Sequence, residues 1–176
     1  NDMEWGPFAF DYLNGHGIDT VTLGAFSKPG SNNFSESRTW QPELESLWRA
    51  EDGACVVLAM AMAPRSHSAY GAPTQLFLNV TTIPNGLAIE LVWIGKQPTM
   101  IGESSSISFV PAPRRTGRWL LDKMGSAVDP EDVIAGGNSY NHAVGDGGAV
   151  VETAAGTMRI VSLDAAVMNP VTPGYP

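Results

Sequence analysis

The chain has 176 residues, of which 43% are hydrophobic, and this is the size and composition of one globular domain with a continuous core. The formal net charge of −8 argues against nucleic acid or an anionic membrane as a partner, because both attract basic patches. No stretch reaches the roughly 18 apolar residues that a membrane-spanning helix requires, and the single cysteine, Cys55, excludes a disulfide within the chain. We therefore expect one domain over residues 1–176.

Aromatic residues gather near the start of the chain, at Trp5, Phe8, Phe10 and Tyr12. Stacked aromatic rings can bind a sugar or a planar ligand, because they offer a large apolar surface with a defined geometry. The same residues can equally contribute to the core of a β-sandwich and need no ligand there. The sequence leaves both interpretations open.

The segment from residue 40 to residue 48 also has two interpretations. Trp40, Leu44, Leu47 and Trp48 have the spacing of one face of a helix, and Pro42 would lie near the first helical position. Residues 44–48 fit a bent strand equally well. We expect at most one short helix in the chain, around residues 43–48.

The middle of the chain gives the clearest signal for β-structure. Residues 54–63 form a nearly continuous apolar run, as expected for a strand that is covered on both faces, and residues 75–82 read as a second strand. The dipeptide Asn85-Gly86 predicts a type I′ hairpin turn, because both residues tolerate positive φ. Residues 87–96 then alternate, so that one face of the predicted strand carries Leu87, Ile89, Leu91 and Trp93.

The rest of the chain continues as short strands joined by turns. We expect strands at residues 20–23, 104–110 and 157–163, and short strands or connections at residues 119–124 and 128–135, the second interrupted by Pro130. A glycine-rich turn is expected at residues 145–148, and a proline-rich tail at residues 169–176. Many short strands with this spacing predict an all-β fold, a two-sheet antiparallel β-sandwich with at most one short helix.

The sequence contains no recognisable catalytic motif. The three histidines, His16, His67 and His142, lack the spacing of a zinc site, so no metal is predicted. His142 with Asp146 comes nearest to a pair of ligands, but a polar turn is the preferred interpretation of these two residues, because no EF-hand spacing supports a calcium ion. Glu90 is expected on a solvent-facing side of its strand.

Several short strings, spread over most of the chain, resemble proteins related to family-38 glycoside hydrolases. They are SKPG at 27–30, WIGKQPTMIGE at 93–103, ISF at 107–109, DP at 129–130, GNS at 137–139, HAVGDG at 142–147, MRI at 158–160 and SLDA at 162–165. The resemblance covers the C-terminal β-sandwich domain of these longer proteins and implies the same fold here.

Two departures from that family bear on function. The large N-terminal part, which carries the metal and the nucleophile in such glycosidases, has no counterpart in these residues. Within the string at 93–103, the family pattern has an arginine, an apolar residue and a proline before the glutamate, where this chain has Met100, Ile101 and Gly102. Lys96 and Glu103 are retained and could pair. The resemblance therefore implies a protein that is not an enzyme.

In size the chain also resembles the stand-alone pink pigment-binding chromoproteins of oyster-type mushrooms. That resemblance implies a non-catalytic protein that binds an apolar aromatic small molecule, an organic chromophore, at a sheet end or in the seam of a homodimer. The residues expected to line the site are Trp5, Phe10, Tyr12, Trp93 and Met100, with His142 as a polar handle. The alternative is a carbohydrate-binding or accessory module of a glycoside hydrolase.

Overall fold

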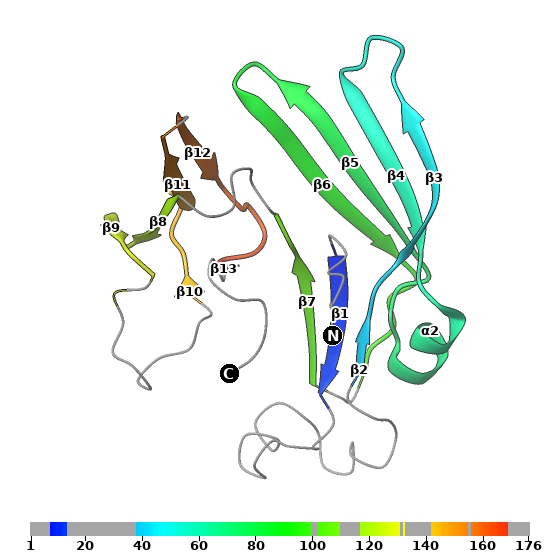
Figure 1. Cartoon of the computed structure of the whole chain (residues 1–176). Coiled ribbons are helices and arrows are strands. Elements are labelled where there is room, and N and C mark those ends of the chain that lie inside the picture. Colours follow the sequence, from blue (N-terminus) through cyan, green and yellow to red (C-terminus); the bar gives the residue numbers. More distant parts are fainter. Residues whose placement is uncertain are drawn as a thin grey trace. The chain divides into compact units, whose positions relative to one another are not determined.

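The computed structural model of the chain describes residues 8–13, 38–99, 102–109, 117–130, 132, 142–154 and 156–168 (Figure 1). Within these ranges it contains thirteen strands and one short helix, and every strand pair is antiparallel. The predicted all-β antiparallel fold with at most one short helix is confirmed. The chain divides into two compact units, residues 1–109 and 110–176, and each unit contains two of the sheets in the described ranges. The single domain over residues 1–176 stays a prediction.

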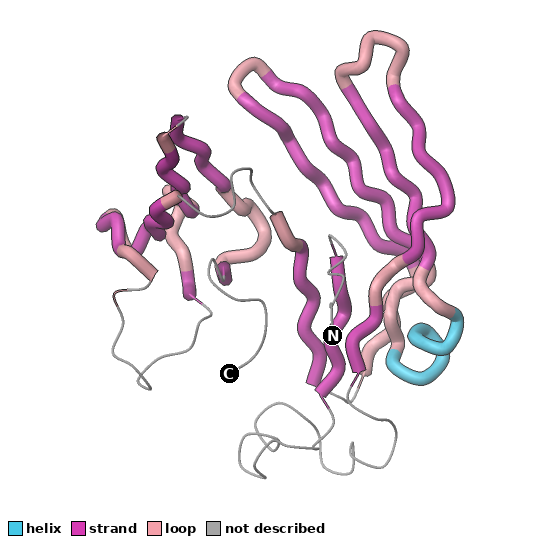
Figure 2. The backbone as a smooth tube through the Cα atoms, in the orientation of Figure 1, coloured by secondary structure: helices cyan, strands magenta, loops and turns pink. Residues whose placement is uncertain are grey.

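The larger sheet of the first unit consists of two successive hairpins. Its order is β3 (Glu43–Arg49), β4 (Cys55–Ala61), β5 (Gln75–Ile83) and β6 (Gly86–Ile94), and Figure 2 shows the two hairpins as adjacent long magenta tubes. The apolar run predicted at residues 54–63 forms β4, a strand with neighbours on both sides. The alternation predicted from residue 87 is confirmed, because Leu87, Leu91 and Trp93 pair with Thr82, Leu78 and Leu76 in one continuous register.

The helix expected around residues 43–48 is wrong, because this segment is strand β3. The register of β3 against β4 shifts between Leu44 and Ser46, so that Glu45 is an extra residue in a β-bulge. The bulge puts Leu44 and Leu47, three residues apart, on the same face of the sheet. That spacing of three produced the apparent helical periodicity, and the alternative of a bent strand is correct.

The turn between β5 and β6 also differs from its prediction. The pairing of Ile83 with Gly86 leaves Pro84 and Asn85 as the two central residues. Neither Asn85 nor Gly86 has positive φ, and Pro84 fixes φ near −65°. A type I′ turn is therefore excluded, although the hairpin itself forms as predicted.

The second sheet of this unit has three strands, in the order β2 (Arg38–Trp40), β1 (Phe8–Leu13) and β7 (Gly102–Ile107). In the central strand, Phe10 lies opposite Trp40 on one side and Ser105 on the other. Tyr12 lies between Arg38 and Glu103 in the same way. The register thus places two of the predicted site residues in the middle of a sheet.

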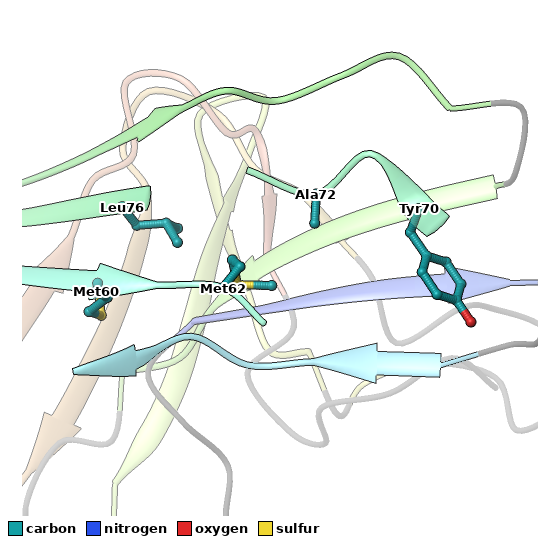
Figure 3. Close-up of a cluster of buried hydrophobic side chains, with 5 residues drawn as sticks. All are labelled: Met60, Met62, Tyr70, Ala72 and Leu76. Atoms are coloured by element: carbon teal, nitrogen blue, oxygen red, sulfur yellow. The ribbon is translucent and has the colours of Figure 1, made fainter. Parts of the chain in front are cut away.

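The helix is α2 (Pro64–Tyr70), which connects β4 to β5. Pro64 lies in the first turn, where its missing N–H costs nothing, and Gly71 ends the helix in a left-handed conformation with φ of 74°. The helix brings Tyr70 onto a buried cluster with Met60, Met62, Ala72 and Leu76 (Figure 3). This cluster is the core of the first unit.

The second unit contains the sheet β12 (Gly156–Ile160), β11 (Ala149–Thr153), β8 (Arg118–Lys123) and β9 (Ser126–Val128), and the short pair β10 (His142–Ala143) with β13 (Val167–Met168). Strand β9 ends at Val128 and the chain turns at Pro130, where the sequence predicts an interruption; residues 131 and 133–135 lie outside the described ranges. The residues predicted at 20–23 and 169–176 lie outside the described ranges.

The glycine-rich turn predicted at residues 145–148 is confirmed, and Asp122 holds it in place. Asp122 accepts a hydrogen bond from the Gly147 N–H at 2.8 Å, and its backbone carbonyl accepts one from the Gly145 N–H. A Cβ atom added at Gly145 or Gly147 would lie 2.7 or 2.8 Å from the same carboxylate. The turn therefore needs glycine at both positions so that the backbone can approach Asp122.

Candidate functional site

One face of the sheet β3-β4-β5-β6 is apolar over nearly its whole length. Side chains alternate along a strand and register partners share a face, so the pairing defines the members of this face. The set, here called the apolar face, consists of Leu44, Leu47, Val56, Leu58, Met60, Leu76, Leu78, Val80, Leu87, Ile89, Leu91 and Trp93. Arg49 and Thr82, at the hairpin ends of β3 and β5, share this side and are its only polar members.

The apolar face is buried on the inner strands β4 and β5 at one end, and it is mostly exposed along the outer strands β3 and β6. At the covered end, Met60 and Leu76 belong to the buried cluster, and Trp40 of β2 packs against that cluster. Leu87, at the other end, is 60% exposed, and Leu44 and Leu47 on the outer strand β3 are also more than half exposed, although Leu44 pairs with the buried Met60. Trp93 lies next to the buried Leu76 and is 45% exposed. An apolar surface of this kind gains free energy when another apolar body covers it.

Trp40 is the aromatic centre of the covered end. The Arg38 guanidinium lies 4.2 Å from the centroid of its ring, and Tyr70 meets the ring edge-on with centroids 5.7 Å apart. Its indole Nε1 is the one buried side-chain polar atom without a hydrogen-bond partner among the described residues. The arrangement places a ring with a spare N–H donor beside the apolar face, within reach of the Phe10 position in β1.

An ion pair joins the end of β6 to β7. Lys96 Nζ lies 3.0 Å from Glu103 Oε2 and also donates to the Gln97 carbonyl. Both side chains are mostly buried, although the Glu103 residue as a whole is exposed through its backbone. The pairing expected from the sequence is confirmed. Because Lys96 neutralises Glu103 and holds it, this carboxylate is occupied by a structural contact.

The structure does not bring all six predicted site residues into one unit of the described chain. Trp93 lies on the apolar face, and the positions of Phe10 and Tyr12 adjoin Trp40 and Glu103 in the three-stranded sheet. These three residues therefore belong to the same unit. The remaining predicted residues of the first unit, Trp5 and Met100, lie outside the described ranges, and His142 belongs to the second unit.

His142 is a buried histidine in β10, opposite Met168. Burial lowers the pKa of its imidazole below the ordinary value of 6.5, and the positive charge of Lys123 lowers it further. The ring is therefore neutral at pH 7, with one nitrogen as a donor and the other as an acceptor. Within the second unit it can therefore both donate and accept a hydrogen bond.

The opposite face of the same sheet carries a second feature, which the sequence reasoning missed. One row of register partners runs from Trp48 through Val57 and Asn79 to Glu90. Trp48 is 53% exposed, and Asn79 Nδ2 donates to Glu90 Oε2 at 2.9 Å. Glu90 is exposed, as expected. Trp48 went unnoticed because its spacing from Leu44 was read as helical, which would have placed both residues on one face.

No group of three or more His, Cys, Asp or Glu residues within the described ranges gathers closely enough to hold a metal ion. The helix in these ranges is also too short to cross a membrane.

The chain was compared with known families, curated proteins and solved structures. No family model matches it. No curated protein matches it, and no solved structure does. The site is therefore interpreted from its own geometry, and the resemblance noted in the sequence stays a prediction.

Proposed function

We propose that this protein is a non-catalytic binding protein for an apolar aromatic small molecule, and that the molecule is a pigment. The apolar face is the observation that carries the proposal. Neighbouring strands lie about 4.8 Å apart, so the four strands span roughly 14 Å, which is the scale of a planar ligand with several fused rings. Burial of the exposed leucines and of Trp93 under such a ligand would supply the binding free energy without any charge.

The ligand would lie against the exposed part of the face, with Trp93 as its aromatic contact next to the covered end. Aromatic pairs contribute about 0.5–1.5 kcal/mol beyond the area that they bury. Phe10 and Tyr12, whose positions adjoin Trp40 and Glu103 in the three-stranded sheet, would complete the site from that sheet. A homodimer in which two such faces enclose the ligand is part of the same proposal.

The absence of catalysis is part of the proposal as well. Two carboxylates of the sheets that carry the candidate surfaces are engaged, Glu103 by Lys96 and Glu90 by Asn79. A general acid or nucleophile must instead be able to reach a substrate. We expect no turnover of an aryl mannoside, the substrate that the family resemblance implies. Turnover that a Glu103→Gln change abolishes would contradict this part.

Nile red tests the binding proposal because this dye is neutral, planar and apolar. Its fluorescence should rise and shift to shorter wavelength on titration with the folded protein, and the signal should saturate at a defined stoichiometry. Pigment extracted from the natural source should compete with the dye. A weak, non-saturating signal equal to that of a folded acidic control protein would overturn the proposal.

A carbohydrate-binding accessory module is the second candidate, and the row from Trp48 to Glu90 favours it. An exposed indole and a hydrogen-bonded amide-carboxylate pair offer a sugar both a stacking surface and polar partners. The two candidates use opposite faces of one sheet. Glycan binding that is lost in Trp48→Ala and kept in Trp93→Ala would support the module, whereas the reverse dependence of dye binding would support the pigment protein.

A further inference from the structure

The hairpin between β8 and β9 has an unusual residue at its tip. Lys123 pairs with Ser126, so the turn consists of Met124 and Gly125 alone. Their φ angles are 55° and 84°, which match a type I′ turn, and Met124 is the one non-glycine residue with positive φ in the described ranges. Asn, Asp or Gly is the ordinary choice at this position, because a longer side chain is strained there. The chain thus keeps a thioether at a site that disfavours it.

Met124 is also the most exposed of the described methionines. Its exposed fraction is 102%, compared with 38% for Met158, whereas Met60 and Met62 are buried at 4% and 5%. Met168 is half-buried in β13. An oxidant in solution therefore reaches the Met124 sulfur without any opening of the fold, and it reaches the two core sulfurs only after unfolding of the first unit.

We propose that Met124 is a site of reversible oxidation by peroxide. A lone pair of the thioether sulfur attacks one peroxide oxygen, an S–O bond forms as the O–O bond breaks, and the second oxygen leaves as water after proton transfer. The sulfur is oxidised by two electrons and the peroxide is reduced by two. The product, methionine sulfoxide, is polar and is a substrate for methionine sulfoxide reductases, which need the same access.

The position limits the consequence of oxidation to the surface. The turn is held by the Gly125 N–H, which donates to Asp122 Oδ1 at 2.8 Å, and this contact does not involve the Met124 side chain. Oxidation therefore converts an apolar hairpin tip into a polar one while the sheet stays intact. Oxidation of Met60 or Met62 would instead put a polar group into the core of the first unit.

Peptide mapping by mass spectrometry after timed exposure of the full chain to hydrogen peroxide tests the proposal. Met124 sulfoxide should form at least about tenfold faster than sulfoxide at Met60 or Met62, because reactivity follows exposure. Treatment with both methionine sulfoxide reductases, one for each sulfoxide epimer, should restore the original mass. The thermal unfolding midpoint of the singly oxidised protein should lie within about 2 °C of the untreated value.

Met124→Leu removes the sulfur and keeps an apolar tip, and Met158→Leu is the matched control at a second methionine that is exposed in the described part of the chain. Met124→Leu should abolish the fast oxidation and Met158→Leu should leave it unchanged. If Met124 reacts no faster than the buried methionines, or if its sulfoxide resists the reductase, the proposal is wrong. The mapping of the unmodified sequence gives this answer even if a variant folds poorly.

Discussion

Replacement of Trp93 by alanine should weaken the binding of Nile red by about 20- to 100-fold. A tryptophan side chain buries about 150–250 Å² when it is fully covered, and 45% of Trp93 is exposed. About 70–110 Å² is therefore open to a ligand, which corresponds to about 1.7–2.8 kcal/mol at ~25 cal/mol per Å². Each 1.4 kcal/mol is about a factor of ten in the dissociation constant.

Fluorescence titration of the purified variants measures this effect. Trp48→Ala is the matched control, because Trp48 is similarly exposed on the other face of the same sheet. Trp93→Leu keeps apolar contact with Leu76 and should lose less affinity than Trp93→Ala, which separates the aromatic contact from damage to the core. An unchanged affinity in a Trp93→Ala protein that keeps its circular dichroism spectrum would refute the placement of the ligand on the apolar face.

Three further predictions concern the second unit. Gly148→Ala should lower the free energy of unfolding of this unit by about 2–4 kcal/mol in denaturant unfolding, because the new Cβ would lie 2.0 Å from the Ile160 carbonyl oxygen at a φ of 70°. Gly125→Ala is also at positive φ but has no close neighbours, so it should destabilise the unit less. Equal destabilisation by the two changes would contradict the role of the Ile160 contact. Met124→Asn should stabilise the hairpin by about 0.5–1 kcal/mol, because asparagine tolerates this conformation better, and a lower unfolding midpoint would count against the strained turn. Because the pKa of His142 is lowered, the unfolded chain binds more protons, so the histidine's contribution to stability is complete above about pH 6.5 and is lost as the pH falls below it. His142→Gln should flatten this part of the stability curve, and an unchanged slope would show that other groups cause it.

The strands with simple alternation could be predicted from the sequence, and the irregular positions could not. The pairing of residues 75–83 with residues 86–94 follows from period-two patterning and a tight turn. The bulge at Glu45 could not be predicted from the periodicity of the sequence, because one inserted residue changes the spacing of residues on the same face from two to three. The predicted turn type is wrong for a similar reason. The pairing register makes Pro84 a central residue of the turn, and the dipeptide Asn85-Gly86 alone carries no information about that register.

Helix α2 was missed although its signals are present in the sequence. Pro64 at the start and Gly71 directly after Tyr70 are the usual end markers of a helix. The segment between them is only seven residues long and carries no apolar periodicity, so the markers alone were not enough. Its burial comes from tertiary packing of Tyr70 against Trp40, a residue far away in the sequence.

The candidate site was predictable only in part. The alternation of β6 identifies the face on which Trp93 lies, but exposure of that face depends on how much of it β2 and α2 cover, and this is a tertiary property. The position of Trp48 could not be predicted either, because the bulge at Glu45 decides that it shares a row with Asn79 and Glu90. His142 was singled out for its residue type, and its burial in β10 could not be inferred from a two-residue strand.

The measurement that tests the proposed function most directly is the visible absorption spectrum of the protein purified from its natural source, combined with mass spectrometry of what it releases on denaturation. We expect an absorption band in the visible range that disappears or shifts on unfolding, together with release of one apolar aromatic compound in stoichiometric amount. A colourless folded protein that releases no small molecule would contradict the proposal and would favour the carbohydrate-binding module.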